Sequence, residues 1–579
     1  MTACATNPGS RPADAALNAL VEEYFESQLE LLPMSATAIG DGRYDDRLDE
    51  TTSPGFREKA LGLQRAFLDR ARQLDPEALS SSARLTWEIF VAERELALEG
   101  QRYAEQLMPI NQMTGLPMDL AVYGSGTGPQ PFANARDYDR FLARAREFPR
   151  WVDGAIAMMR EGMSRGITVP RPAMAKAVPQ LRDIASAELG QNIFWAPIER
   201  LPGEIPAKDR ERITAAYRVA LSQEILPAYR KLADFIERDY LPAARTTVGW
   251  ADLPEGADWY RWRVRDATTM DVSPEEVHQL GLAEVARIRG QMLEVKEAVG
   301  FEGDLDAFFK HLEEDPKFYF TREADLLEAY RDVKHKIDDL LPKLFSDFPK
   351  ARYEIRAVEP FRAASAAGAS YQAPSADGKR PGIFYINTHN LKAQPNFGIE
   401  TLSLHEAAPG HHFQIAIQQE LTELPRFRRF NNYTSYAEGW ALYAESIGKE
   451  LGLFTDPYQW YGRLSDEMLR AMRLVVDTGL HSKGWTRERA IQYMLDNSSL
   501  AESDVTAEVE RYIVWPGQAL GYKLGQLHIT ALRAKAERQL GAAFDVREFH
   551  SQILRDGALP MDVLAAKIDR WVAAKKGAG

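Results

Sequence analysis

The chain has 579 residues, of which 45% are hydrophobic and 27% are charged, and its formal net charge is −13. This composition is that of a folded protein with a sizeable core, and the acidic balance argues against nucleic acid or an anionic membrane surface as the main partner. The one cysteine, Cys4, excludes a disulfide framework and a metal site built from thiolates.

Residues 1–14 are predicted to be a disordered leader. Within it, Thr2-Ala3-Cys4-Ala5 resembles the end of a bacterial lipoprotein signal, in which a small residue precedes the cysteine that becomes lipidated. No apolar segment precedes Cys4, so this interpretation requires that the signal has been removed; the alternative is an ordinary cysteine in a flexible tail. We therefore expect an exported bacterial protein, periplasmic or held at the outer membrane by a lipid anchor, and otherwise a cytoplasmic one.

Beyond the leader, most predicted elements are helices, because apolar residues recur at helical spacing between Pro and Gly interruptions. The predicted helices cover residues 15–32, 56–75, 81–106, 136–165, 208–240, 274–299, 322–345, 463–480, 486–497 and 518–540. The glycine-containing segments 110–130 and 360–382 are predicted to be long loops, and the clearest strand pattern is at 382–387.

These elements predict a mainly α protein with a small β-sheet near the middle of the chain. A soft boundary near residues 245–255 separates an N-terminal helical half, 15–250, from a C-terminal half, 251–579, that contains the candidate site. Since no flexible linker is evident, we expect the two halves to form one compact unit around a deep cleft.

The most informative stretch is His405-Glu406-Ala407-Ala408-Pro409-Gly410-His411-His412. Zinc hydrolases with a His-Glu-x-x-His helix place both imidazoles on one face, but here Pro409 stands at the fourth position after the first histidine. On a straight helix His411 would point roughly 120° away from His405, and His412 would lie about 10 Å further along. Either can share a metal with His405 only if the backbone bulges, and Pro followed by Gly can supply that bulge.

A second helix pattern follows about 25 residues later and contains Glu438 and Glu445, which share one helix face because they are seven residues apart. Its apolar surroundings make a carboxylate costly unless the group is paired or bound to a metal. Two histidines and one glutamate leave a fourth position for water, which is the layout of a catalytic zinc site. The ordinary alternatives are a His-Glu pair beside a proline kink and carboxylates that form surface ion pairs.

Together with Pro516-Gly517-Gln518-Ala519-Leu520-Gly521-Tyr522, these motifs resemble a large bacterial family that is catalogued as a domain of unknown function and grouped with the gluzincin zinc peptidases. The helix with its two glutamates also resembles that of thimet-type oligopeptidases and Taq-type carboxypeptidases. The likeness runs nearly end to end and includes residues 33–48. The chain departs from the well-studied peptidases by two extra residues within the His-Glu-x-Gly-His motif.

The resemblance implies that His405 and Glu438 are zinc ligands and that Glu406 is the general base acting on a water molecule. His411 matches the histidine after glycine and is preferred as the second histidine ligand, while His412 stays open as the alternative ligand or as a residue behind the site.

By the same resemblance, Glu445 would orient a ligating imidazole, and the Tyr522 hydroxyl would stabilise the oxyanion unless this tyrosine is a core aromatic. The strand at 382–387 is expected to offer its edge to an extended peptide.

The implied function is a zinc-dependent metallopeptidase that holds one Zn²⁺ per chain and hydrolyses oligopeptides, with carboxypeptidase-like action as one form. The alternatives are a zinc hydrolase of non-peptide amides or esters, and a non-catalytic peptide-binding lipoprotein in which Pro409 has broken the site. No nucleic-acid partner is expected, and contact with a membrane is expected only through an N-terminal lipid anchor.

Overall fold

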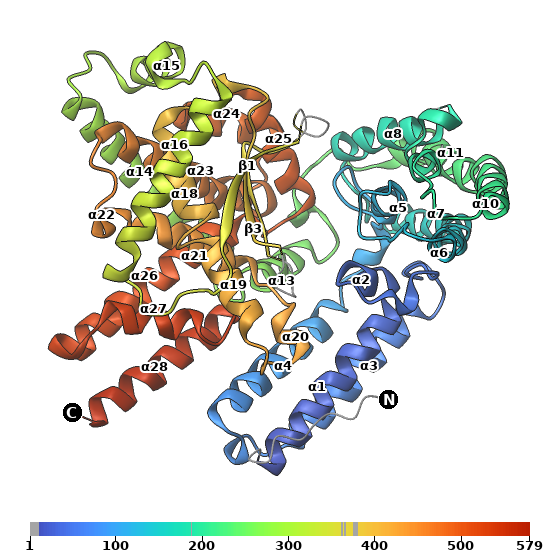
Figure 1. Cartoon of the computed structure of the whole chain (residues 1–579), viewed down its shortest axis with the longest axis horizontal. Coiled ribbons are helices and arrows are strands. Elements are labelled where there is room, and N and C mark those ends of the chain that lie inside the picture. Colours follow the sequence, from blue (N-terminus) through green and yellow to red (C-terminus); the bar gives the residue numbers. More distant parts are fainter. Residues whose placement is uncertain (1–10, 187, 360–362, 364–365, 375–379, 579) are drawn as a thin grey trace. The chain divides into compact units, whose positions relative to one another are not determined.

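A computed structural model describes residues 11–186, 188–359, 363, 366–374 and 380–578. Helices dominate and are accompanied by one three-stranded sheet, so the predicted mainly α class is confirmed (Figure 1). Cys4 lies outside the described residues. None of the described helices combines the length and the apolar character that crossing a membrane requires.

The chain divides into two compact units: Met1–Ala83 with Phe90–Trp259, and Arg84–Ile89 with Tyr260–Gly579. The helices that begin before the boundary at Trp259 are α1 (Pro12–Leu31), α2 (Pro33–Ala38), α3 (Phe56–Arg72), α4 (Ser81–Gly100), α5 (Leu116–Gly124), α6 (Ala135–Ala145), α7 (Phe148–Arg165), α8 (Arg171–Ser186), α9 (Ala196–Glu199), α10 (Ala207–Ala220), α11 (Leu226–Phe235), α12 (Leu241–Ala243) and α13 (Gly256–Thr268). The middle of α4 and most of α13 belong to the second unit. The first helix begins at Pro12, inside the predicted leader, because proline suits the first turn of a helix.

Two predictions for the first unit are wrong in detail. The segment 110–130 contains α5, which starts with Pro117 in its first turn and buries Leu120 and Ala121, so its glycines flank a short core helix. The single helix predicted at 136–165 is two helices, because Pro149 cannot continue α6 and instead starts α7.

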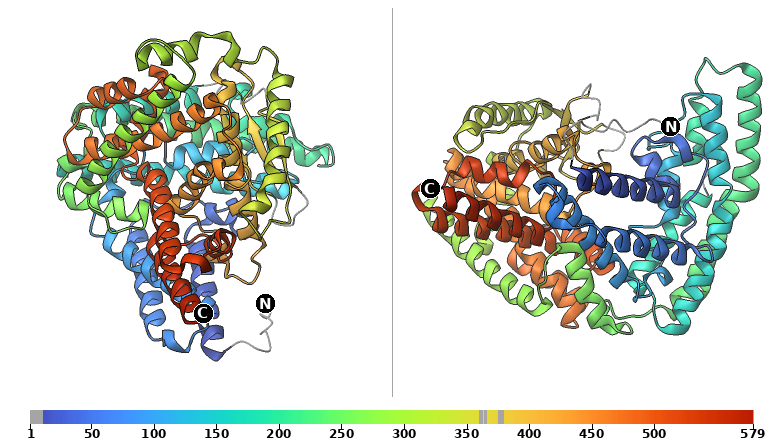
Figure 2. Two further views of the ribbon diagram at one scale, coloured as in Figure 1. Left: turned by 90° about the vertical axis from the view of Figure 1, so that its left-hand side faces the viewer. Right: turned by 90° about the horizontal axis from the view of Figure 1, so that it is seen from below.

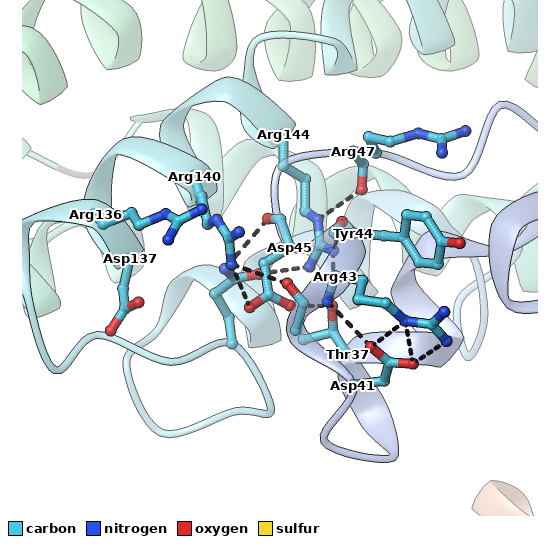
Figure 3. Close-up of polar contacts among 12 residues, drawn as sticks. Thr37, Asp41, Arg43, Tyr44, Asp45, Arg47, Arg136, Asp137, Arg140 and Arg144 are labelled. Atoms are coloured by element: carbon cyan, nitrogen blue, oxygen red, sulfur yellow. Dashed lines mark hydrogen bonds and ion pairs between the residues drawn. The ribbon is translucent and has the colours of Figure 1, made fainter. Parts of the chain in front are cut away.

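In the first unit, Arg144 of α6 holds part of the N-terminal motif at residues 33–48 in place. The fully buried Arg144 donates hydrogen bonds to the carbonyl oxygens of Arg47 (2.7 Å) and Tyr44 (2.8 Å) and to the hydroxyl of Thr37 (2.8 Å), as Figure 3 shows. A buried guanidinium is tolerated when its N–H groups are satisfied in this way. The motif therefore has a structural role, in which one arginine of α6 fixes the loop after α2.

The second unit contains the strands and the remaining helices. They are α14 (Pro274–Ala298), α15 (Leu305–Glu314), α16 (Glu323–Leu340), β1 (Tyr353–Ala357), β2 (Ala369–Gln372), β3 (Gly382–Ile386), α18 (Ile399–Glu406), α19 (His411–Glu420), α20 (Arg426–Arg429), α21 (Thr434–Ser446), α22 (Gly448–Leu451), α23 (Pro457–Ser482), α24 (Arg487–Asn497), α25 (Glu502–Val514), α26 (Leu520–Leu540), α27 (Val546–Leu554) and α28 (Met561–Ala578). Within this unit α14 packs along α23, and α21 packs along α26.

The sheet corrects one expectation. Its strand order is β1-β3-β2, with β1 parallel and β2 antiparallel to β3, so the strand predicted at 382–387 is the central one and both of its edges are paired. Every residue of β3 is buried, which is the pattern of a central strand. Part of the predicted loop 360–382 forms β2, which contacts α18. The helix α16 packs against β1, one of the strands drawn in yellow in Figures 1 and 2.

His550 of α27 supplies a pH prediction for this unit. Its Nδ1 lies 2.7 Å from the carbonyl oxygen of Leu344 and must donate to it, so Nε2 accepts from the Tyr443 hydroxyl at 2.9 Å. Burial lowers the pKa of His550 to about 3, whereas an unfolded histidine titrates at about 6.5. The stabilisation from neutral His550 is therefore complete above about pH 6.5 and is lost as the pH falls towards 3.

We expect His550→Gln, which keeps a donor and an acceptor but does not titrate, to reduce this pH dependence. Between about pH 5.5 and 4 the free energy of unfolding of the wild type should fall by about 1.4 kcal/mol per pH unit more than that of the variant. Urea denaturation followed by circular dichroism measures both slopes; equal slopes would show that His550 does not contribute.

Candidate metal centre

The helix that carries His405 ends before His411 is reached. α18 stops at Glu406, the segment Ala407–Gly410 leaves the helical conformation, and α19 starts at His411 (Figure 1). The indole N–H of Trp440 in α21 donates to the carbonyl oxygen of Pro409 at 2.7 Å and ties the break to the neighbouring helix. The backbone interruption expected at Pro and Gly is thus a complete break between two helices.

This break brings three side chains of the predicted site together. The Nε2 atoms of His405 and His411 each lie 3.5 Å from Oε2 of Glu438, and one ligand atom from each residue can be chosen so that all lie within 4.8 Å of one another. Zinc bonds of about 2.0–2.1 Å in a tetrahedron would separate neighbouring ligand atoms by about 3.4 Å. Within the described part of the chain, no other group of three His, Cys, Asp or Glu residues meets this criterion.

A buried carboxylate oxygen supports a cation at this position. Oε2 of Glu438 is buried and accepts no hydrogen bond of normal geometry within the described residues, and the Nε2 atoms of His405 and His411 face it only at 3.5 Å. A buried carboxylate oxygen without a donor is costly. The donor set and its unsatisfied oxygen therefore fit a metal ion held by His405, His411 and Glu438.

The charges of the group act on one another. Burial lowers the pKa of His405, but the carboxylates of Glu438 and Glu445 outweigh burial and raise that pKa to about 10. Burial favours the neutral form of Glu438, yet the imidazoles of His411 and His405 hold its pKa well below the usual range. The group thus retains a proton in the metal-free state, and metal binding would displace that proton.

Glu445 lies behind His405. Its Oε1 is 2.7 Å from Nδ1 of His405, and both side chains are buried. Since a carboxylate can only accept, the Nδ1–H of His405 donates to Glu445, and Nε2 is left facing Glu438. This is the arrangement that fixes the tautomer and orientation of metal-ligating histidines.

His412 does not join the group. Its Nε2 donates to the carbonyl oxygen of Ala351 (3.1 Å), so its Nδ1 accepts from the hydroxyl of Tyr371 in β2 (2.8 Å). Burial lowers the pKa of His412 to about 4. Both ring nitrogens are occupied, and the side chain links α19 to the sheet. Of the two histidines that the sequence left open, the structure brings His411 to Glu438 and places His412 elsewhere.

The proposed base and the proposed oxyanion donor keep free polar ends. Glu406, the last residue of α18, and Tyr522, in the first turn of α26, are both partly exposed, and neither side chain has a hydrogen-bond partner among the described residues. Both lie within electrostatic range of the ligand group. The carboxylate of Glu406 contributes to raising the pKa of His405, and the carboxylate of Glu438 contributes to raising the pKa of Tyr522.

Two glycines bring the helix of Tyr522 against the helix of Glu438. A Cβ on Gly525 would lie 1.9 Å from the carbonyl oxygen of Ser435, and a Cβ on Gly439 would lie 2.6 Å from the Cα of Gly525. Side chains at these positions would force α21 and α26 apart. The sequence analysis did not predict this contact. Its signal is a glycine inside each of two predicted helices, Gly439 and Gly525.

The turn before α26 is held by Asp477, another residue that sequence reasoning missed. The fully buried carboxylate accepts from the Tyr260 hydroxyl at 2.6 Å and from the backbone N–H of Gly517 at 3.0 and 3.1 Å, and burial raises the pKa of Asp477 to about 7. An aspartate within an apolar helical run, next to Val475 and Val476, is a signal that could have identified it.

Gly410 is predicted to be essential for the group. A Cβ at this position would lie 1.9 Å from the carbonyl oxygen of His405 and 2.3 Å from that of Leu404. We expect Gly410→Ala to separate His405 from His411 and to abolish metal binding, as measured by elemental analysis. Gly290→Ala in α14, where a Cβ meets no atom within 4 Å, is the matched control. Full metal content in Gly410→Ala would contradict the prediction.

Comparisons with known proteins find matches over most of the chain. The family model "Bacterial protein of unknown function (DUF885)" matches residues 33–568. The crystal structure of a "putative lipoprotein" from Colwellia psychrerythraea is similar with a TM-score of 0.87 and 30% identity, covering 97% of this chain and 100% of that one. A "putative lipoprotein of unknown function" from Shewanella oneidensis is similar with a TM-score of 0.77 and 17% identity, covering 96% and 99%.

A third structure, described as a "putative oligoendopeptidase F" from Bacillus anthracis str. Ames, has a TM-score of 0.26 and 12% identity, covering 89% of this chain and 96% of that one. A comparison with curated proteins finds no match. The family match and the 30% identical relative agree over nearly the full length. The chain therefore belongs to the bacterial family of unknown function DUF885.

Proposed function

We propose that this chain is a zinc-dependent peptidase that hydrolyses oligopeptides. The observation that carries the proposal is the pairing of an unsatisfied His405–His411–Glu438 group with two nearby side chains, Glu406 and Tyr522, whose polar ends are free. A structural metal site would be closed by a fourth ligand and would not need free acid–base groups beside it.

The ligand set supports zinc over harder cations. Imidazole is a good ligand for zinc, whereas calcium and magnesium favour sites made of oxygen atoms. Three protein ligands leave one coordination position open. When bound, zinc would lower the pKa of a water molecule at that position and polarise the substrate carbonyl.

The protein residues would then perform the proton transfers and hold the developing charge. Glu406 accepts a proton from the attacking water through its free carboxylate and later gives it to the leaving amine. Tyr522 donates its phenolic hydrogen bond to the oxygen of the former carbonyl as that oxygen becomes negative. Glu445 keeps His405 in the tautomer that presents Nε2 to the group.

Oligopeptides are favoured as substrates by the sheet beside α18. In the described sheet β2 pairs only with β3, so its second edge can bond the backbone of an extended peptide by adding a strand. This interaction would recognise main-chain amides rather than one particular side chain. It supports peptides over small esters, and carboxypeptidase-like action remains one form of the proposal.

Metal analysis and peptide hydrolysis test this function together. We expect about one zinc per chain after purification without added metal, and cleavage of mixed oligopeptides that a chelator stops and zinc restores. Glu438→Ala should lose both properties, whereas Glu450→Ala in the adjacent α22 is the matched control. Absence of metal after zinc is offered would overturn the proposal, and hydrolysis of esters without peptides would reassign the substrate class.

We also propose that the protein is exported as a lipoprotein. The residues around Cys4 support this proposal, as do two similar proteins that are described as putative lipoproteins. Incorporation of labelled palmitate in the native host, lost in Cys4→Ser, is the expected result; equal labelling of both chains would contradict the assignment.

A further inference from the structure

A buried arginine lies against the ring of Tyr522. The guanidinium carbon of Arg473 in α23 is 4.3 Å from the centroid of that ring, and Arg473 is only 6% exposed. This distance is within the range in which a guanidinium interacts with an aromatic face. The contact joins α23 to the first turn of α26, where Tyr522 keeps its hydroxyl free.

Arg473 is also held in place by α25. Its Nε lies 3.1 Å from the hydroxyl oxygen of Tyr512 and 3.2 Å from Oε2 of Glu508, and its Nη2 donates to the same Oε2 at 2.8 Å. Glu508 also accepts from Arg511 at 3.0 Å, which fixes the carboxylate in turn. A guanidinium anchored in this way keeps one orientation relative to the ring that it covers.

The third guanidinium nitrogen of Arg473, Nη1, takes no part in the ion pair with Glu508. Nη1 is buried and has no hydrogen-bond acceptor within the described residues. Leaving a charged donor unpaired is costly unless another group compensates. The negative face of the Tyr522 ring is the compensating group that this geometry offers.

The charges around Tyr522 give this contact a chemical consequence. Burial and the carboxylate of Glu438 raise the pKa of Tyr522, while Arg473, Arg511 and Arg470 act to lower it. The phenol therefore keeps its proton at neutral pH, yet any negative charge that develops at its hydroxyl is stabilised by the buried Arg473 and by the half-buried Arg470 and Arg511. Such fixed charges stabilise a transition state without needing to reorganise.

We propose that Arg473 is a positioning residue for Tyr522. It fixes the phenol ring so that the hydroxyl points to the substrate oxygen. It also stabilises the negative charge that develops on the phenol oxygen as the hydroxyl donates its hydrogen bond to the substrate. The inference rests on the proposed peptidase function, and it assigns to α23 a role in transition-state stabilisation that the metal group does not supply.

A double-mutant cycle on the zinc-loaded protein tests this role. We expect Arg473→Lys, which keeps the charge but loses the planar contact, to lower kcat about 10-fold with unchanged KM and metal content. Tyr522→Phe should lower kcat by about 100-fold or more. In the Tyr522→Phe background, Arg473→Lys should have no further effect, because its action passes through the phenol.

Arg463→Lys is the matched control, since Arg463 is also a buried arginine of α23 and covers a different ring, that of Trp460, at 5.0 Å. It should leave kcat unchanged. Equal losses from Arg473→Lys in both backgrounds, or no loss in the wild-type background, would overturn the proposal, because a purely structural arginine acts independently of Tyr522.

A second readout separates this proposal from the peptidase function. With 3-fluorotyrosine at position 522 of the metal-free full chain, Arg473→Lys should shift and broaden the ¹⁹F resonance, whereas Arg463→Lys should leave it in place. An unchanged resonance in Arg473→Lys would refute the positioning role. A shifted resonance in a chain that hydrolyses no peptide would support the contact while the peptidase function fails.

Discussion

Glu406→Gln is expected to lower kcat for peptide hydrolysis by about 1,000-fold or more, while the zinc content remains that of the wild type. Glutamine has the size of glutamate but cannot accept a proton from water, so the chemical step loses its base. The fold should not change, because the Glu406 side chain has no hydrogen-bond partner among the described residues. Steady-state kinetics beside elemental analysis give both quantities.

Glu400→Gln on the same helix is the control for this result. Glu400 is buried, accepts from Lys336 at 2.9 Å and from the backbone N–H of Phe454 at 2.6 Å, and has no place in the metal group. We expect Glu400→Gln to lower stability and to retain kcat per folded molecule, the reverse of Glu406→Gln. Loss of zinc in Glu406→Gln would show that Glu406 holds the metal, and retained activity would show that another group is the base.

His411→Ala is expected to lower zinc affinity by more than about 100-fold. Loss of a metal ligand should cost more than loss of a residue that only hydrogen-bonds to a ligand. His412→Gln is expected to keep the metal, because His412 bonds Ala351 and Tyr371 instead of Glu438. Its cost should appear as about 1–2 kcal/mol of lost stability. Competition with a chromophoric chelator measures the affinities, and urea denaturation measures the stability.

The two histidines form a matched pair, since they are adjacent in the chain and each is changed singly. Zinc loss in His412→Gln with retention in His411→Ala would reverse the ligand assignment. Loss in both variants, with both proteins still folded, would mean that the start of α19 as a whole is required for metal binding. Only loss confined to His411→Ala agrees with the distances to Glu438.

Local periodicity was sufficient for many of the helices. The helix predicted at 486–497 is α24, and the one predicted at 518–540 is α26, within two residues at each end. Such segments carry their own apolar faces and end signals, so the sequence specifies them without knowledge of their partners. The same approach failed for 110–130, where the glycine content concealed α5, whose apolar residues are buried by tertiary contacts.

The strand at 382–387 shows a different limit. Its apolar run correctly predicted β3, but the prediction of a free edge was wrong because β1 pairs with one edge of β3 and β2 with the other. β1 pairs in parallel with β3 although the whole of β2 lies between them in the chain, and residues 369–372 have a weak strand pattern of their own. Pairing partners are selected by the packing of the whole sheet, which local propensity does not describe.

The sequence by itself determined the mainly helical class, the candidate residues and the common helix face of Glu438 and Glu445, because these depend on composition and on the fixed period of the helix. Only the tertiary structure decided which histidine meets Glu438, since the direction of α19 after the break at Pro409 depends on contacts such as that of Trp440. The contact of Arg473 with Tyr522 likewise exists only once α23 and α26 are packed.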